Sequence, residues 1–122
     1  MTRRSAAAYL WDLRNASQLA MSFADGKSLR DYQTDALLQS AIERQMITIG
    51  EALRGAIEQD QSLISHFTDV RKIIAFRNHV VHKYFDVDDA TVWDVIINHL
   101  PGVVEIVNVL LADDPLAAEA NE

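Results

Sequence analysis

Cysteine is absent from this chain of 122 residues. Without thiols the protein cannot form a disulfide framework, a thiolate metal site or a cysteine nucleophile. We therefore expect a cytoplasmic protein whose chemistry depends on other side chains.

Glycine and proline are scarce, with four and two residues respectively. Hydrophobic residues make up 49% of the chain and charged residues 24%. This profile is typical of a globular protein with few turns, and it favours long helices over a sheet. No internal repeat or low-complexity linker divides the chain, so we expect a single domain spanning residues 1–122.

Long hydrophobic runs are also missing. No uninterrupted apolar run approaches the roughly 20 residues that a membrane-spanning helix needs. Near the N-terminus, Asp12 and Arg14 interrupt the apolar run before it could serve as the core of a signal peptide. The sequence therefore predicts no membrane partner.

Positive charge is absent from the C-terminal part of the chain. All eleven Lys and Arg lie within residues 1–85 beside nine acids, whereas residues 86–122 hold nine acids. The net charge of -7 argues against non-specific coating of nucleic acid. Between Arg71 and Phe85, however, there are four basic residues, two histidines and no acid, so a local cationic site can exist on an acidic protein.

Apolar residues recur at helical spacing in the first half of the chain. The first helix is expected from Ser5 to about Phe23, ending at Asp25 and Gly26. Ser28 is a candidate N-cap for a short turn through Tyr32. A second long helix is expected from Thr34 or Asp35, with one apolar stripe: Leu38, Ile42, Ile49, Leu53 and Ile57. Gly50 inside it would let a neighbouring helix approach closely.

Two further helices are expected in the second half. The pattern breaks between about Glu58 and Phe67, and Thr68 with Asp69 marks the start of a third helix that runs to about Tyr84. Asp88 can cap a fourth helix, which Pro101 should kink or divide near Leu100. The acidic tail, residues 112–122, is expected to fray. The simplest architecture is an all-α, up-and-down four-helix bundle with a kinked or divided last helix.

The third predicted helix holds the residues that are candidates for chemistry. On a helical projection Arg77 lies in the middle of an apolar stripe, where a buried guanidinium needs a carboxylate, a phosphate or a water-filled cleft. Asn78 and His82 share a neighbouring stripe of the helix. His82 lies about 140° around the helix from Arg77. Either both long side chains reach into one groove, or two copies of the helix meet at a shared site. A structural ion pair of Arg77, with Glu51 as the first candidate partner, is the alternative.

A metal site is the other alternative for this segment. His79 and His82 are three residues apart, and His99 or Asp86 could complete a ligand set. His79 projects away from His82, and no second pair of ligands is evident. We therefore expect no metal and no cofactor.

Beyond these patterns, the sequence resembles a known family. Residues 77–84, RNHVVHKY, have the arrangement R-x4-H-x-Y and resemble the signature of HepT-like toxins in the HEPN superfamily. Residues 41–52, AIERQMITIGEA, resemble the second-helix pattern of that family. The stretch after the tyrosine is also similar, through Val87, Asp88, Val92, Trp93, Leu100 and Pro101. The similarity spans nearly the whole chain and implies a HEPN-like helical bundle.

The resemblance implies a metal-independent endoribonuclease that acts as the toxin of a toxin–antitoxin pair, with a minimal nucleotidyltransferase as antitoxin. Arg77 and His82 would be the catalytic pair, and Asn78 would position them. Tyr84 resembles the tyrosine that the partner modifies with AMP, although its place on the apolar stripe also suits a core aromatic. A homodimer would bring two motifs together about one axis. The rival hypothesis is a non-catalytic helical module that binds a nucleotidyltransferase or a nucleotide.

Overall fold

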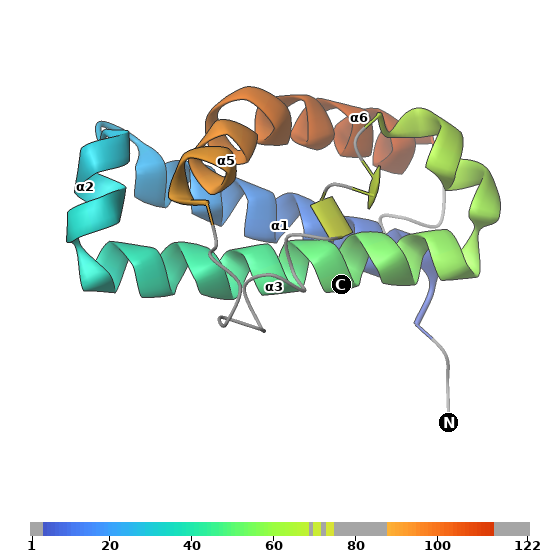
Figure 1. Cartoon of the computed structure of the whole chain (residues 1–122). Helices are drawn as coiled ribbons and strands as arrows, with labels where there is room; N and C mark the ends of the chain where they lie inside the picture. The colour runs from blue at the N-terminus through green and yellow to red at the C-terminus, as the bar shows by residue number, and fades with distance from the viewer. Residues whose placement is uncertain (1–3, 69, 72, 75–87, 114–122) are drawn as a thin grey trace.

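A computed structural model describes residues 4–68, 70–71, 73–74 and 88–113 of the chain. These residues form an all-α bundle without a strand among them (Figure 1). The long helices α1, α3 and α6 lie side by side, and α1 runs antiparallel to both of the others. The predicted fold class, a HEPN-like helical bundle, is therefore confirmed.

Helix α1 spans Ala6–Ala24 and begins and ends where the sequence predicts. The side chain of Ser5 accepts a hydrogen bond of 3.1 Å from the backbone N–H of Ala8, which satisfies one of the free donors at the helix start. At the other end, Gly26 has a φ of 73°, a left-handed conformation that glycine adopts without steric cost. The chain can therefore reverse directly after α1.

Helix α2, Leu29–Thr34, is a short connector at one end of the bundle. The predicted cap Ser28 forms a full capping box: its hydroxyl accepts from the Asp31 N–H, and its own N–H donates a hydrogen bond of 2.8 Å to the Asp31 carboxylate. Tyr32 is buried and stacks on Trp93, with ring centroids 5.7 Å apart. This aromatic pair joins α2 to α5, the first part of the last helix.

Helix α3, Ala36–Gln59, starts from the predicted cap Asp35, whose carboxylate accepts from the N–H groups of Leu37 and Leu38. Most of its predicted apolar stripe is buried against α1: Leu38, Ile42, Ile49 and Leu53, with Ile57 partly buried. The close helix contact is at Gly55, where a Cβ would overlap the ring of Tyr9 from α1. Gly50 is buried as well.

Replacing Gly55 with alanine tests this contact. The added methyl group must displace the Tyr9 ring, and overpacking of this kind costs about 1–3 kcal/mol, partly offset by the roughly 1 kcal/mol by which alanine favours a helix over glycine. We expect Gly55→Ala to lower the free energy of unfolding by about 1 kcal/mol in urea denaturation. Gly102→Ala in α6 is the matched control, because a Cβ at this position would meet open space. This substitution should therefore stabilise the helix. Equal stabilisation by both substitutions would contradict the close contact.

The segment between Gln59 and Thr68 contains a 3-10 helix, η1, at Gln61–His66. Asp60 caps it by accepting from the Ser62 N–H. Residues 70, 71, 73 and 74 are helical, as the predicted third helix requires. The rest of that predicted helix lies outside the described residues.

The last helix is divided, as predicted from Pro101, but the break has a specific form. Helix α5, Asp89–Asp94, continues into a π-helical turn, η2, at Val95–His99, and then into α6, Leu100–Asp113. The predicted cap Asp88 accepts from the Ala90 N–H and from the Thr91 hydroxyl. These hydrogen bonds lower the pKa of the Asp88 carboxyl, and the one from the Thr91 hydroxyl has the largest effect. Pro101 cannot donate a backbone hydrogen bond, and the wider turn directly before it accommodates that loss.

This last helix bears on the expectation that the chain has no membrane-spanning segment. Asp89–Asp113, 25 residues long, is long and apolar enough by length and composition to cross a membrane. The sequence contains no uninterrupted apolar run of this length. Length and composition do not separate a membrane span from the core helix of a soluble protein, and here Val95, Leu100 and Val107 are fully buried in the bundle.

Candidate functional site

Most of the predicted site residues lie outside the part of the chain that the structure describes. These are Arg77, Asn78, His82 and Tyr84, together with His79 and Asp86 of the alternative metal set. Glu51, the suggested partner of Arg77, lies on the exposed side of α3. Its pairing with Arg77 stays a prediction.

The residues that precede the motif show which side of their helix faces the core. Val70 and Ile73 are buried, Ile74 is partly buried against the core, and Arg71 is exposed. This is the orientation that the predicted apolar stripe requires for Val70, Ile73 and Ile74. Arg77 follows Ile73 by four residues. If the helical pattern continues, Arg77 lies on the same stripe, and this position stays a prediction.

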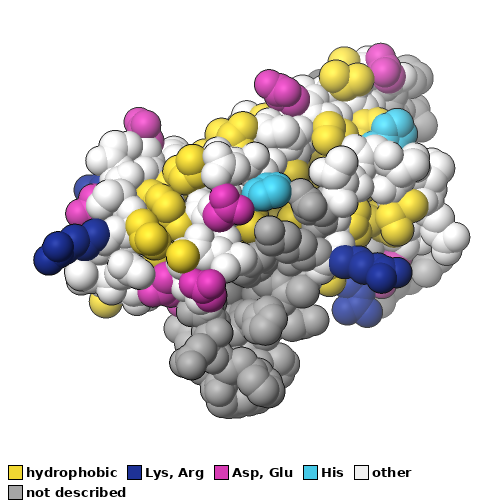
Figure 2. All heavy atoms as spheres, turned by 45° about the horizontal axis from the view of Figure 1, so that its top comes forward, with side chains coloured by type: hydrophobic (Ala, Val, Ile, Leu, Met, Phe, Trp, Pro, Cys, Tyr) yellow, Lys and Arg dark blue, Asp and Glu magenta, His cyan; other side chains and the backbone are white. Residues whose placement is uncertain are grey.

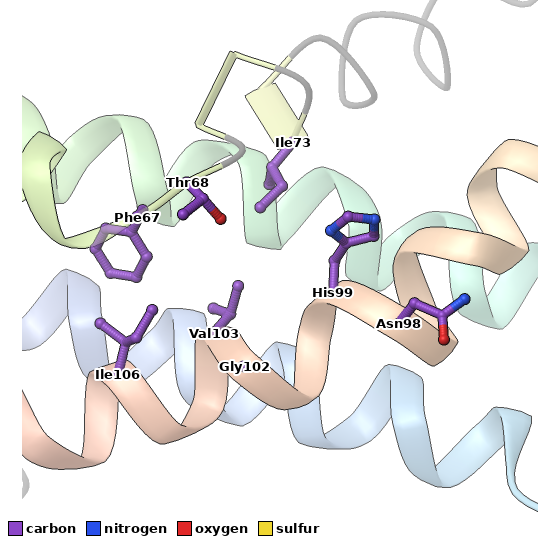
Figure 3. A pocket seen from close by; sticks show the side chains of 8 residues that line it. All are labelled: Phe67, Thr68, Ile73, Asn98, His99, Gly102, Val103 and Ile106. Carbon is purple, nitrogen blue, oxygen red and sulfur yellow. The ribbon is translucent and has the colours of Figure 1, made fainter.

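A pocket lies directly beside this segment, between it and the π-helical turn (Figure 3). Its volume is about 140 Å³. The apolar lining consists of Phe67, Ile73, Val103 and Ile106, and the polar lining of Thr68, Asn98 and His99, with Gly102 at the backbone. Figure 3 shows the ring of His99 at one side of the gap, with Ile73 and Thr68 across it and Asn98 directed away.

The π-helical turn sets the direction of His99. Asn98 donates a hydrogen bond of 2.7 Å from Nδ2 to Oδ1 of Asp94, and Nε2 of His99 lies 3.3 Å from Oδ2 of the same carboxylate. Residues five apart, such as Asp94 and His99, lie about 140° apart on a regular α-helix, whereas a π-helical turn closes on the i, i+5 pairing. Because the turn is π-helical, one carboxylate can hold both side chains.

The contact of Asp94 with His99 is worth little as a source of stability. The side chains are 45% and 28% exposed respectively, and ion pairs at this exposure contribute about 0–1 kcal/mol. Its larger effect is to restrict the imidazole to one orientation at the edge of the pocket. Sequence reasoning considered His99 only as a metal ligand, and it missed Asp94, because their spacing is wrong for a helical pair unless the π-helical turn is known.

The helices on one side of the pocket are acidic. Helices α5 and α6 with the turn between them carry Asp88, Asp89, Asp94, Glu105 and Asp113, and residues 88–113 contain no Lys or Arg. Figure 2 shows acidic and hydrophobic side chains interspersed over this face, with Lys and Arg toward its margins. A phosphate would therefore be disfavoured on this side of the pocket.

Metal ligands do not gather in the described part of the chain. No group of three or more His, Asp or Glu side chains there is arranged to hold a metal ion. His99, a candidate ligand from the sequence, has its Nε2 3.3 Å from Oδ2 of Asp94. The absence of a metal from the catalytic motif stays a prediction, since the motif itself lies outside the described residues.

Comparison with known proteins identifies a family for nearly the whole bundle. The family model described as "Ribonuclease HepT-like" matches residues 13–110. This range includes the R-x4-H-x-Y motif, the pocket and the π-helical turn.

Several relatives cover most of the chain at low identity. One from Methanocaldococcus jannaschii, named "Putative RNase", is 23% identical over 115 residues, which are 93% of this chain and 93% of the relative. A second of the same name from that organism is 24% identical over 112 residues, covering 90% of this chain and 100% of the relative. A "Probable ribonuclease HepT" from Thermococcus cleftensis is 28% identical over 101 residues, covering 83% and 91%. No solved structure shows significant similarity to the chain.

Proposed function

The chain belongs to the HepT-like ribonuclease family, and on that premise we propose that it is a metal-independent endoribonuclease toxin, neutralised when a cognate minimal nucleotidyltransferase attaches AMP to Tyr84. The observation that carries this proposal is the motif R-N-x-x-x-H-x-Y at residues 77–84, which lies inside the range matched by the family model. The substrate is RNA.

The residue types of the motif suit cleavage of a phosphodiester. Arg77 keeps its charge at any physiological pH and can bind the scissile phosphate through two N–H groups. His82 can take a proton from the ribose 2'-OH or give one to the leaving oxygen, because its ordinary pKa lies near neutrality. When His82 takes the proton of the 2'-OH, the 2'-oxygen forms a bond to phosphorus, the bond from phosphorus to the 5'-oxygen breaks, and the leaving 5'-oxygen receives a proton from water or from His82 of a second copy. Asn78 positions these groups, and the set needs no metal to supply charge or a base.

The described structure supports this proposal through the anchoring of the motif on both sides. Ile73 is buried in the core four residues before Arg77, and Asp88 caps α5 four residues after Tyr84. Four residues of extended chain span at most about 14 Å. The first and last functional residues are therefore tethered within that distance of fixed points of the bundle.

A homodimer belongs to the proposal as well. The 140° between Arg77 and His82 on one helix is resolved if two copies of the motif meet about a two-fold axis. The rival, a non-catalytic module that binds a nucleotidyltransferase or a nucleotide, keeps the same fold but needs no reaction at the motif.

The proposal is tested by incubating the purified protein with total RNA in EDTA. We expect cleavage to persist in the chelator, because Arg77 and His82 supply the charge and the proton transfer. Weaker RNA binding at higher salt should accompany it, since a few cationic groups provide the attraction. Intact RNA in EDTA and cleavage restored by Mg²⁺ would contradict metal independence. Intact RNA under both conditions, from folded protein, would favour the non-catalytic module.

A further inference from the structure

We infer that the pocket between Ile73 and the π-helical turn is a binding site for a single RNA base, in which His99 is a binding residue held in place by Asp94. This inference rests on the proposed function, because it assigns a part of the substrate to a site next to the proposed catalytic motif. It gives the enzyme a means to prefer certain cleavage positions.

The size of the pocket selects the part of a nucleotide that it can take. At about 140 Å³ it exceeds the space for one or two waters, but it is well below the roughly 300–1,000 Å³ of sites that hold drug-sized ligands. A base fits this range, whereas a whole nucleotide with its ribose and phosphate does not.

The side chains that line the pocket match the apolar faces and the polar edge of a base. The apolar atoms of Ile73, Val103 and Ile106 offer contact to the faces of a planar ring, and the Thr68 hydroxyl and the imidazole ring of His99 line its edge (Figure 3). RNA-binding proteins recognise single-stranded bases by stacking them on aromatic rings and by hydrogen bonds to their edges, and Phe67 and His99 are the aromatic rings that line this pocket. The carboxylate of Asp94, which contacts His99, disfavours the phosphate at the same place.

The π-helical turn is the feature that makes the site specific rather than a packing defect. It brings the carboxylate of Asp94 to His99 and Asn98, so the edge of the pocket has a restrained polar group instead of a free one. Turns of this kind often occur at functional sites, since they interrupt an otherwise regular helix at a cost.

The distance to the proposed catalytic motif suits a neighbouring nucleotide. Ile73 lines the pocket and precedes Arg77 by four residues, a reach of at most about 14 Å along the chain. An RNA strand with its scissile phosphate at Arg77 could therefore place a nearby base in the pocket.

The test measures RNA binding in a His82→Ala background, which prevents cleavage. Fluorescence anisotropy compares homopolymeric single-stranded RNA of each base with an abasic RNA of equal length, at one fixed salt concentration. His99→Ala should weaken binding of at least one homopolymer about 5- to 10-fold and leave the abasic RNA unchanged. Gly102→Phe should do the same by occupying the pocket, because a side chain at Gly102 begins in open space. His66→Ala is the matched control, since His66 is exposed on η1 and does not line this pocket.

The outcomes separate this inference from the proposed function. If the protein with His82 intact cleaves RNA but neither His99→Ala nor Gly102→Phe changes binding or the mapped cleavage positions, the base site is overturned and the ribonuclease remains. Equal weakening on abasic and homopolymeric RNA also overturns it, because the contact would then be to the backbone. If the wild-type protein neither binds nor cleaves RNA, the proposed function fails and the inference fails with it.

Discussion

Replacing either Arg77 or His82 with alanine should reduce RNA cleavage by about 10²- to 10⁴-fold while leaving the protein folded. Loss of the guanidinium removes the group that would stabilise charge on the phosphate, and loss of the imidazole removes the group that would transfer the proton. These residues act on one step, so the double variant should lose little more than either single one. Arg77→Lys should recover only part of the activity, because an ammonium group cannot bind two phosphate oxygens in a fork.

Arg30→Ala and His66→Ala are the matched controls. Arg30 is exposed on α2 and His66 is exposed on η1, so each control removes the same chemical group from the same protein outside the proposed site. Both should cleave RNA at close to the wild-type rate. Full activity in folded His82→Ala protein would refute the assignment of the base.

The same variants report on the predicted dimer. If each site combines Arg77 of one copy with His82 of the other, mixing Arg77→Ala and His82→Ala proteins should restore part of the activity, because some mixed dimers hold one intact site. If both residues act within one copy, mixing should restore none. Sedimentation showing a stable, active monomer at micromolar concentration would contradict the dimer itself.

The helix ends were predictable from the sequence because they depend on single side chains. Ser5, Ser28, Asp35 and Asp88 all cap the helices that they were expected to cap. A short polar side chain at these places satisfies backbone N–H groups that have no partner within the helix. The apolar stripe of α3 was predictable for a similar reason, since its period of 3.6 residues is a property of one helix alone.

Features that depend on two segments at once could not be predicted. Gly55 meets the Tyr9 ring only because α1 and α3 pack at one particular register, and the helical pattern of the sequence did not indicate this contact. Pro101 indicated a break near Leu100, but not that the backbone would widen into a π-helical turn at Val95–His99. The contact between His99 and Asp94 follows from that turn, and so does the part of the pocket lined by Asn98 and His99.

The family motif was recognisable because its residue types and spacing carry the chemistry directly. The arrangement of Arg77, His82 and Tyr84 in space remains a prediction, since these residues lie outside the described part of the chain and any second copy would also affect it. On a straight helix, His82 and Tyr84 would point about 200° apart. Both can face one site only if it lies at the end of the helix or between two copies.

Co-expression with a cognate nucleotidyltransferase should add one or more AMP units to Tyr84 and abolish toxicity. The phenolic oxygen would attack the α-phosphorus of ATP, forming a phosphodiester as pyrophosphate leaves and the phenolic proton passes to a base. The product carries a negative charge and a bulky nucleoside within two residues of His82. It would block RNA by its volume and compete for Arg77. Tyr84→Phe should therefore remain folded and toxic, yet resist neutralisation, because the reaction requires the hydroxyl.

The other two tyrosines of the chain provide the controls for this experiment. Tyr32 is 1% exposed, and burial raises the pKa of its phenol, so it is both inaccessible and a poor nucleophile. Tyr9 is partly buried over Gly55, and Arg4 stacks on its ring at 4.8 Å. Tyr9→Phe should be neutralised like the wild type, and intact-mass and peptide mass spectrometry should locate the adduct on the peptide that contains Tyr84. An adduct on Tyr9, or AMP-dependent neutralisation of Tyr84→Phe, would remove Tyr84 from this role, because neither result is compatible with its hydroxyl as the acceptor.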